Sequence, residues 1–418
     1  MYNTRGERLK GICTGCACLC DDVEMEVREY PGTSDILNVC KKGWILFNSS
    51  EDENMRAAAS VNGAPVSLEE SIKAAGRLLS QARELFIFGL DNSSCEAQLL
   101  AIELAKSFNA AIDDCSAYPM GPLTESIVSG DIPGHTFEEA RSSDLLIYWG
   151  SDPYHSHPRH LSRYTYYCQQ AYSKYAVLPE AEICSIDIRS TPLQKLSTHT
   201  FTIRPGQDLS LIREVRDALN GGKTNERSQA FISMIKGHRK CTLFAGSGLM
   251  CSLDGEVDDL KALVYEIGGQ METGLIPMVD HYNMRGFNSA LYQHAGFINR
   301  ARFADNAPVR GSSFPQAIKN KEFDCLLTMA ADPFSDLPNI LVDELSESRV
   351  PIISIGPFAT RTTAKSDIVI PTGIPGIESK GRAVRMDGQE VILNAIRKES
   401  AYTGEEEVMR TLLKEAMN

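Results

Sequence analysis

Four cysteines near the start of the chain are the feature that most constrains what it can fold into. Cys13, Cys16 and Cys20 lie within eight residues of one another, and Cys40 follows after a gap. Four thiolates can hold the four corners of a [4Fe–4S] cube. Zinc is the alternative, but its usual pattern is two Cys-x-x-Cys pairs, and Cys40 has no such neighbour. The spacing therefore favours an iron–sulfur cluster, with Cys18 as a spare thiol.

The rest of the sequence is typical of a globular protein in a reducing compartment. Its 418 residues predict about two to four domains. The formal net charge of −13 argues against general nucleic-acid binding. The first ten residues are polar, and no stretch approaches the ~18 apolar residues of a membrane span. We therefore expect a cytoplasmic protein that binds neither nucleic acid nor a membrane.

From residue 84 onward, short apolar runs alternate with longer mixed segments, a pattern that predicts parallel strands and crossover helices. The expected helices cover residues 94–108 and 256–267, the second closed by Gly268-Gly269. The expected strands are residues 85–89, 145–150, 183–188, 241–245, 325–330, 351–355 and 368–370.

Two halves of this pattern repeat. The stretch Phe86-Ile-Phe-Gly-Leu resembles Leu243-Phe-Ala-Gly-Ser, and Leu145-Leu-Ile-Tyr-Trp-Gly-Ser-Asp-Pro resembles Cys325-Leu-Leu-Thr-Met-Ala-Ala-Asp-Pro. Two related doubly wound α/β units are implied, each with ligand-binding loops at the carboxyl ends of its strands. One bound nucleotide per unit is the natural expectation. The alternative is that any two α/β units look alike in motifs this short.

Several loops after strands carry side chains suited to phosphate. Serines, imidazoles and guanidinium groups follow the expected strand 145–150, and phosphate binding is favoured there over a histidine metal site. The glycine turn at Gly246-Ser247 is a weak signal that gains value from the repeat. Near residue 380, glycines and paired charges would let backbone amides approach a large polar ligand. The candidate ligand-binding residues are Gly150, Ser151, Asp152, His157, Arg159, His160, Arg163, Gly246, Ser247, Asp332, Glu378 and Arg385.

Taken together, these motifs resemble the catalytic B subunit of formylmethanofuran dehydrogenase, within the molybdopterin oxidoreductases that use molybdenum or tungsten. The resemblance covers essentially the whole chain. It rests on Cys13-Thr-Gly-Cys16-Ala-Cys-Leu-Cys20, Cys40-Lys-Lys-Gly43, His157-Pro-Arg-His-Leu-Ser-Arg163, Asn283-Met-Arg-Gly286, Gly376-Ile-Glu and Arg385-Met-Asp. It implies that Cys13, Cys16, Cys20 and Cys40 are the cluster ligands.

The resemblance also implies roles for other residues. Lys42 would relay electrons between cluster and pterin, although on spacing alone it is equally a solvated lysine. The loops after the strands would hold a bis-molybdopterin guanine dinucleotide with tungsten or molybdenum, and Arg285 would match the active-site arginine. The substrate pair would be CO2 and formate.

The family's domain organisation gives a division of the chain. Residues 1–57 would form the [4Fe–4S] domain, residues 58–142 and 322–418 one pterin-binding α/β domain, and residues 143–321 a second one inserted into it. Larger relatives continue into a β-barrel that this chain is expected to lack. The expected partners are therefore a barrel subunit, an amidohydrolase-like subunit and a ferredoxin-type electron carrier.

One departure divides the functional hypotheses. Family members place a metal-ligating Cys or selenocysteine and then His just before a Gly-Pro pair, where this chain has Pro119 and Met120. Cys115 could replace the ligand if the loop were re-routed, and His281 could replace the imidazole. The first hypothesis is a redox subunit that interconverts CO2 and formate. The second is a structural partner without redox turnover, as in the formyltransferase/hydrolase complex of methylotrophs.

Overall fold

The computed structural model describes residues 8–26, 35–168, 181–304, 307–397 and 400–418. The chain forms two compact units: unit 1 comprises Met1–Ala117, His281–Arg385 and Glu390–Asn418, and unit 2 comprises Tyr118–Asp280 and Met386–Gln389. These boundaries differ from the expected 143 and 321. The reason on the C-terminal side is that β13 (Ala301–Ala304) pairs with β7 (Ala111–Asp113), which makes residues after 280 part of the sheet of unit 1.

The sheet of unit 2 has five parallel strands in the order β10-β9-β8-β11-β12. The bounds are β8 (Leu145–Trp149), β9 (Glu182–Asp187), β10 (His199–Thr202), β11 (Lys240–Ala245) and β12 (Glu272–Pro277). Every residue of β8 is buried, as expected for a strand with both faces covered. Counted along the chain, the order is 3-2-1-4-5, which is the doubly wound order with its switch point between β8 and β11.

The helices of unit 2 begin at recognisable sequence signals. Thr136 and Glu139 form a capping box at the start of α5, and Asn225 and Ser228 do the same for α10. The helices are α4 (Gly121–Val128), α5 (Phe137–Arg141), α6 (Pro153–Ser156), α7 (His160–Arg163), α9 (Asp208–Leu219), α10 (Glu226–Ile235), α11 (Ser247–Leu253) and α12 (Asp258–Gly268), with a 3-10 turn η3 (Pro192–Lys195).

Unit 1 contains a nine-stranded sheet in the order β14-β13-β7-β6-β15-β16-β17-β4-β5. Its centre, from β7 to β17, is parallel, and both edges are antiparallel. The remaining bounds are β4 (Ser60–Val61), β5 (Ala64–Pro65), β6 (Leu85–Gly89), β14 (Ala307–Arg310), β15 (Cys325–Met329), β16 (Ile352–Gly356) and β17 (Ile368–Pro371), and a separate hairpin pairs β18 (Gly381–Val384) with β19 (Glu390–Leu393).

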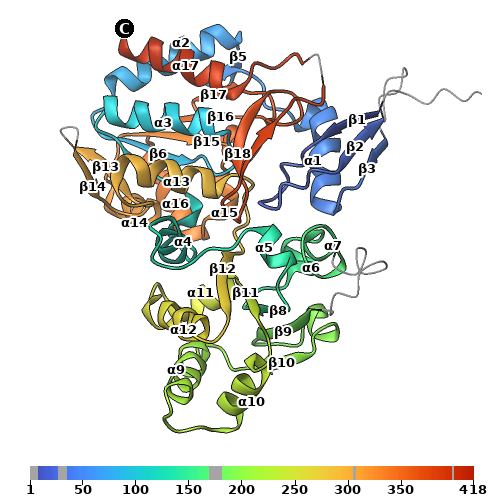
Figure 1. Ribbon diagram of the computed structural model, residues 1–418. Helices are drawn as coiled ribbons and strands as arrows, with labels where there is room; N and C mark the ends of the chain where they lie inside the picture. The colour runs from blue at the N-terminus through green and yellow to red at the C-terminus, as the bar shows by residue number, and fades with distance from the viewer. Residues whose placement is uncertain (1–7, 27–34, 169–180, 305–306, 398–399) are drawn as a thin grey trace, which may run out of the picture. The chain divides into compact units, whose positions relative to one another are not determined.

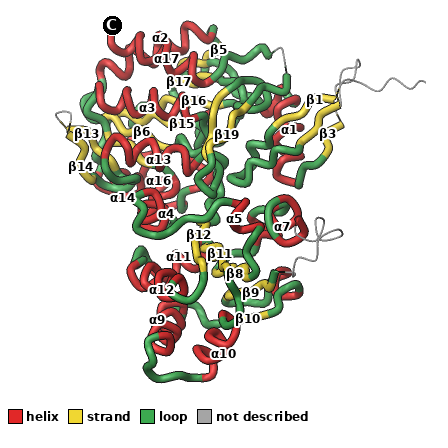
Figure 2. Tube along the Cα trace, in the orientation of Figure 1, coloured by secondary structure: helices red, strands yellow, loops and turns green. Residues whose placement is uncertain are grey.

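Helices cover both faces of this sheet. One face packs against α2 (Leu68–Gln81), α3 (Cys95–Ser107), α13 (Met284–Ala295) and α17 (Glu405–Met417), and the other against α14 (Phe314–Asn320), α15 (Pro333–Asp336) and α16 (Asn339–Ser348). Figure 1 shows α2 and α17 side by side although they stand near opposite ends of the chain. In Figure 2 the strands appear in yellow among these helices.

The N-terminal part of unit 1 carries the cysteines. It has a small antiparallel sheet of β1 (Arg8–Gly11), β2 (Val23–Glu26) and β3 (Asp35–Leu37), followed by α1 (Lys41–Glu51) and a 3-10 turn η1 (Glu53–Met55). The loop between β1 and β2 holds Cys13 to Cys20, and Cys40 stands at the N-cap of α1.

The predicted repeat corresponds to a spatial repeat with a permuted chain order. The five central strands of unit 1 run β7-β6-β15-β16-β17, and those of unit 2 run β12-β11-β8-β9-β10 when read in the matching direction. The stretches matched in sequence are thus matched in position, β6 with β11 and β15 with β8. Gly150 and Ala330, after the equivalent strands β8 and β15, have left-handed φ angles of 60° and 49°.

The prediction of parallel strands joined by crossover helices is confirmed. All seven expected strands occur, with ends that differ from the prediction by at most one residue, and both expected helices are present. The mixed α/β class with parallel sheets is therefore correct. Among the described residues, no helix is long and apolar enough to cross a membrane.

Candidate cofactor cavity and cluster site

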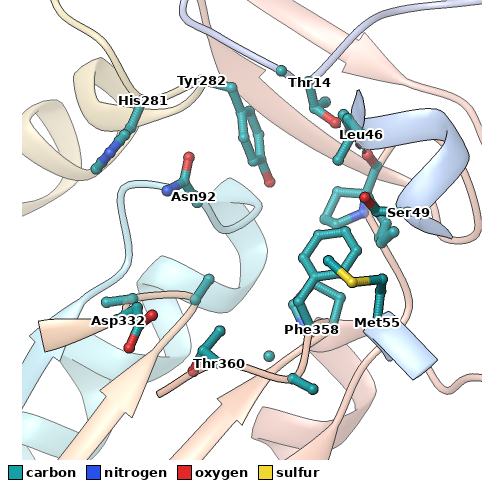
Figure 3. A pocket seen from close by; sticks show the side chains of 18 of the residues that line it. Thr14, Leu46, Ser49, Met55, Asn92, His281, Tyr282, Asp332, Phe358 and Thr360 are labelled. Carbon is teal, nitrogen blue, oxygen red and sulfur yellow. Dashed lines mark hydrogen bonds between the residues drawn. The ribbon is translucent and has the colours of Figure 1, made fainter. Parts of the chain in front are cut away.

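A cavity of about 500 Å³ lies in unit 1 at the carboxyl ends of its parallel strands. Asn92 follows β6, Asp332 follows β15 and Thr360 follows β16, and all three face the cavity in Figure 3. Because β6 and β15 adjoin where the strand order reverses, this is the position at which open α/β sheets bind ligands. The volume lies within the range of small-molecule sites.

Asp332 is held rigidly at this edge. Its Oδ1 accepts hydrogen bonds from the backbone N of Thr362 at 2.9 Å and from its Oγ1 at 2.6 Å. Thr362 is itself fully buried, and its Oγ1 accepts a hydrogen bond from the backbone N of Phe334. The carboxylate that the sequence predicted as a ligand contact is therefore fixed by the neighbouring loop.

The cysteine loop borders the same cavity. Thr14, Gly15 and Lys42 belong to its wall, and Thr14 Oγ1 donates to the carbonyl of Pro375 at 3.1 Å. The loop closes on itself, because the backbone N of Cys13 donates to the carbonyl of Cys20 at 2.9 Å. The segment predicted to hold the cluster thus lies next to the space predicted to hold a cofactor.

Two of the candidate cluster cysteines lie at the N-terminus of α1: Cys40 is its N-cap, and Cys13 contacts its first turn. Cys13, Cys16 and Cys20 are buried and Cys40 is half-buried. A Cβ added to Gly43 would lie 2.9 Å from Cys13 Sγ, so the first turn of α1 reaches this sulfur because Gly43 lacks a side chain. The positive end of a helix dipole favours thiolates, which are the form that binds metals.

Cys18 lies among these thiols. Burial raises the pKa of Cys18 well above its ordinary value, and a hydrogen bond with Cys16 and the negative charges of Cys16, Cys20 and Cys40 add to this effect. Neither the sequence nor the structure gives Cys18 a fixed function.

A second group of potential ligands opens on the cavity. Ligand atoms of Asp91, Cys115 and His281 all lie within 4.8 Å of one another, and Cys115 and His281 belong to the cavity wall. His281 Nδ1 is 2.7 Å from Asp91 Oδ2. Burial opposes ionisation of Asp91, but the charge of His281 and hydrogen bonds from His281 and Cys115 hold its pKa below the ordinary value. Burial and the negative charges of Asp91 and Asp114 raise the pKa of Cys115 well above its ordinary value.

Glu378 forms a buried ion pair with Arg56. Arg56 Nη1 and Nη2 donate to its two carboxylate oxygens at 2.8 and 2.9 Å, and both side chains are less than 5% exposed. The guanidinium also stacks on the ring of Tyr402, 3.8 Å from the centroid, and donates to the carbonyl of Thr372. Glu378 thus anchors the loop that includes Pro375 and borders the cysteines.

Arg285 and Arg385 are both buried in unit 1. Arg285 lies in the first turn of α13, after Asn283, whose side chain donates to the carbonyl of Ser93 and accepts from the backbone N of Val384. Gly286 is required there, because an added Cβ would lie 2.1 Å from Asn283 Oδ1. The predicted Asn283 motif is thus the fixed start of a helix that presents Arg285.

In unit 2 the predicted glycine loops meet at the switch point between β8 and β11. A Cβ on Gly150 would lie 2.1 Å from the backbone N of Leu249, and a Cβ on Gly246 would lie 2.3 Å from the carbonyl O of Gly150. Ser151 is buried beside Gly246, and Ser247 begins α11. The structure therefore brings Gly150, Ser151 and Gly246 together, with Ser247 next in the chain.

The residues after Gly150 divide into buried and accessible groups. Asp152 caps α6 through the backbone N of Tyr154 at 3.1 Å. His157 and His160 are fully buried: His157 Nε2 lies 2.9 Å from the carbonyl O of Val279, and His160 Nε2 lies 3.0 Å from Tyr148 Oη. Burial lowers the pKa of His160 well below its ordinary value. These imidazoles position the loop within unit 2.

Arg159 and Arg163, unlike these imidazoles, are partly exposed. Arg159 is the N-cap of α7, and Arg163 lies in its last turn with its guanidinium over the Tyr164 ring. Among the basic side chains of this loop that were predicted to bind phosphate, Arg159 and Arg163 are therefore the ones that solvent can still reach.

Two solved structures share this fold. One is the formyltransferase/hydrolase complex from Methylorubrum extorquens in complex with methylofuran, with a TM-score of 0.67 and 18% identity over 86% of this chain and 99% of that chain. The other is acetylene hydratase from Pelobacter acetylenicus, with a TM-score of 0.68 and 11% identity over 98% of this chain and 69% of that chain. At these identities the likeness defines the fold class only.

Two curated proteins resemble the sequence along nearly its whole length. Both are B subunits of tungsten-containing formylmethanofuran dehydrogenase 2, that of Methanocaldococcus jannaschii with 27% identity and that of Methanococcus maripaludis with 26%. Each alignment covers 96% of this chain and 97% of the relative. No protein-family model matches the chain. The resemblance to the B subunits of formylmethanofuran dehydrogenase is thus confirmed.

Sequence reasoning missed two residues that organise the cavity. Arg56 has no motif around it, and its ion pair with Glu378 spans 322 positions of the chain. Asp91 stands just beyond the end of the predicted strand 85–89, but the repeat places Gly248 at the equivalent position and therefore gives no signal for a carboxylate. Neither the ion pair of Arg56 nor the position of Asp91 has a local sequence signal.

Proposed function

We propose that the chain is the redox subunit of a formylmethanofuran dehydrogenase-type complex, which interconverts CO2 and formate. The observation that carries the proposal is the position of the cysteine loop and Lys42 in the wall of the unit 1 cavity. A cluster bound by the loop would lie beside a cofactor bound in the cavity, which is the arrangement that electron transfer between them requires.

The donor set fits a [4Fe–4S] cluster. Cys40 is the N-cap of α1, whose Gly43 lets the backbone approach Cys13 Sγ, and Cys16 and Cys20 lie in the buried loop that precedes this helix. Thiolates are the ligands that such clusters use. Lys42 lies two residues after Cys40 and reaches the cavity wall, so its ammonium would stand between cluster and cofactor.

The loops of each unit fit one half of a bis-molybdopterin guanine dinucleotide. In unit 1 the half-cofactor would occupy the cavity beside Asp332. In unit 2 it would lie along Gly150, Ser151 and Ser247, where backbone approaches backbone closely, with Arg159 and Arg163 near its phosphates. When bound, this group with tungsten or molybdenum would supply the two-electron chemistry.

The chain's own residues would bind and orient the substrate. Arg285 would hold formate and stabilise the negative charge that develops when CO2 is reduced. A guanidinium is suited to this because its fork donates two parallel hydrogen bonds to a carboxylate. His281 belongs to the cavity wall and is held by Asp91. It lies four residues before Arg285 in the sequence and could carry the proton.

Further subunits would complete the activity. The relatives are named as B subunits, and one structural neighbour is a multi-subunit complex. We propose an amidohydrolase-like subunit that receives formate, a β-barrel subunit and a ferredoxin-type carrier as partners.

A second function, a structural partner without redox turnover, has one observation in its favour. Pro119 and Met120 stand where the family places Cys and His. Proline has no donor atom, and methionine offers only a neutral thioether.

Metal and pterin analysis of the purified complex separates the two functions. The proposal predicts tungsten or molybdenum together with a pterin, and viologen-linked formate oxidation that Arg285→Lys abolishes. Lys319→Arg, an exchange on an exposed turn of α14, is the matched control and should leave the activity unchanged. A fully assembled complex that contains neither metal nor pterin would support the structural-partner function instead.

A further inference from the structure

We infer that Asp91, Cys115 and His281 form a mononuclear binding site for a divalent transition metal of the zinc type, at the wall of the unit 1 cavity. The site is separate from the four-cysteine loop and, although it borders the cavity proposed for the pterin, its ligands are protein side chains alone. It rests only on the residues of this cluster and not on the proposed redox function. With an ion bound, His281 would be a ligand, and water would carry the proton in its place.

The first argument is the convergence of three ligand types. One carboxylate oxygen, one thiol sulfur and one imidazole nitrogen lie within 4.8 Å of one another. Cysteine and histidine with a carboxylate are ligands that zinc and similar ions prefer, whereas calcium and magnesium prefer oxygen alone. The ligand chemistry therefore selects the class of ion.

The second argument is that the fold presents the three ligands from fixed backbone positions. Asp91 lies just after β6, Cys115 begins the 3-10 turn η2 (Cys115–Ala117) after β7, and His281 precedes α13. The carbonyl O of Asp91 accepts a hydrogen bond from the backbone N of Asn283 at 3.0 Å, which ties the first and third segments together. Little reorganisation would be needed for the three to bind one ion.

The third argument is the charge of the surroundings. The carboxylate of Asp336 acts electrostatically on Cys115 and is itself affected by Asp91 and His281. The wall of the cavity also carries the carboxylate of Asp332. Lys42 lies in the wall of the same cavity, but the carboxylates outnumber it, and an excess of negative charge favours a cation.

The fourth argument is access. Cys115 and His281 line the cavity while Asp91 is fully buried behind them. Three protein ligands with a remaining position open to a cavity is the arrangement of zinc sites that bind a water or a substrate oxygen. The open position would accept water or an oxygen atom of a small molecule in the cavity.

A second cluster of potential ligands, in unit 2, differs from this one in the partners of its carboxylates. His135, Glu139 and Glu272 also lie within 4.8 Å of one another. Glu139 is used in the capping box of α5, and Glu272 pairs with Lys240 at 2.7 Å. Its carboxylates already have structural partners, so this cluster serves as an internal control.

Cobalt(II) is the probe that tests the site, because a thiolate ligand gives an intense charge-transfer absorption with this ion. The full-length chain, with its four-cysteine loop already loaded with the iron–sulfur cluster, is titrated with cobalt under anaerobic conditions, and the cobalt bands are taken as the difference from the spectrum before titration. Zinc is then added as a competitor. We expect one cobalt per chain that Cys115→Ala and His281→Gln each weaken by more than about 100-fold, since even outer-shell changes cost 10–100-fold. His281→Gln keeps a side-chain donor for Asp91, so it guards against a loss of folding.

The matched controls are Cys251→Ser, at an exposed thiol of unit 2, and His135→Gln in the second cluster. Both should bind cobalt as the unmodified chain does. An unchanged cobalt affinity and charge-transfer band in Cys115→Ala would overturn the inference, as would equal losses in Cys251→Ser. Thermal melting of each variant without metal identifies any that fails to fold.

Discussion

The two α/β units repeat the same five strands, yet the loops at their switch points are arranged differently. In unit 1 these loops border a cavity of about 500 Å³ among the strand ends. In unit 2 both loops approach backbone to backbone, at Gly150 and at Gly246, whereas in unit 1 Gly89 makes the equivalent approach but Ala330 takes the place of Gly150. The difference shows that a shared strand order fixes where a ligand can bind, while the loop residues decide how it is held.

The loops differ because different groups close them. In unit 1, the ion pair of Arg56 and Glu378 anchors one wall of the cavity. In unit 2, the buried rings of His157 and His160 hold the loop after β8 against the core. The predictions below test whether these anchors are as different as the structure indicates.

The largest expected effect is at the buried anchor of unit 1. Arg56→Ala would remove the two-pronged partner of the buried Glu378 carboxylate and leave only Arg397 Nη1, 3.7 Å from its Oε1, as a cationic neighbour, which should cost about 3 kcal/mol of unfolding free energy. In unit 2, Arg213→Ala removes an ion pair with Asp259. The Arg213 side chain is 63% exposed, so this loss should cost less than about 1 kcal/mol. Chemical denaturation measures both. Equal losses of unfolding free energy in the two variants would contradict the difference in burial between Arg56 and Arg213.

The next effect concerns the backbone contact in unit 2. Gly150→Ala adds a Cβ that would lie 2.1 Å from the backbone N of Leu249, at a φ of 60°. Strain and overpacking together should cost roughly 2–4 kcal/mol. Gly206→Ala is the control, since Gly206 has a φ of 78° but nothing within 4 Å of its added Cβ. Thermal melts that rank the two variants equally would rule out the close approach.

A smaller effect concerns the stability of unit 1 as the pH rises toward 8. Burial raises the pKa of Glu405 in unit 1 to about 8, although a hydrogen bond from Ser94 opposes this. The folded state then retains a proton that the unfolded chain loses, so stability falls as the pH rises from about 4.5 to about 8. Glu405→Gln should remove about 1–3 kcal/mol of this pH dependence. Hydrogen exchange of α17 between pH 6 and 8 provides the measurement, and an identical slope in the variant would contradict it.

The smallest effect has the opposite sign and lies in unit 2. Burial lowers the pKa of His160 well below its ordinary value, so the unfolded chain binds a proton that the folded unit does not. Stability should therefore fall as the pH drops below about 6.5. Hydrogen exchange of β8 at pH 5.5 and 7 should show this loss in the unmodified chain and a weaker one in His160→Phe. An unchanged loss of stability in His160→Phe would contradict the prediction and mean that another group causes it.

The sequence predicts the interior of the fold better than its edges. Strands such as β6 and β15 are continuous apolar runs, and the prediction matches their ends to within a residue. Strands β13 and β14 escape prediction, because their residues are partly exposed and pair antiparallel at an edge. The domain boundary depends on this pairing, which no local signal reveals.

The candidate site shows the same limit. The cysteine motif and the glycine loops are visible in the local spacing of the sequence. In the structure the first turn of α1 approaches Cys13, and the loops of Gly150 and Gly246 approach each other. The Arg56 to Glu378 pair and the group of Asp91, Cys115 and His281 arise only when distant segments meet. Contacts of this kind depend on tertiary packing and leave no periodic pattern in the sequence.

The central claim is that the cysteine loop beside the cavity holds an iron–sulfur cluster, and its content can be measured directly. Anaerobically purified protein should contain about four iron atoms and four acid-labile sulfides per chain. It should also give the electron paramagnetic resonance signal of a reduced cluster after treatment with dithionite. Cys16→Ser should lose both, while Cys18→Ser should retain them. Stoichiometric zinc without sulfide in the unmodified protein, or equal losses in the two variants, would contradict the account.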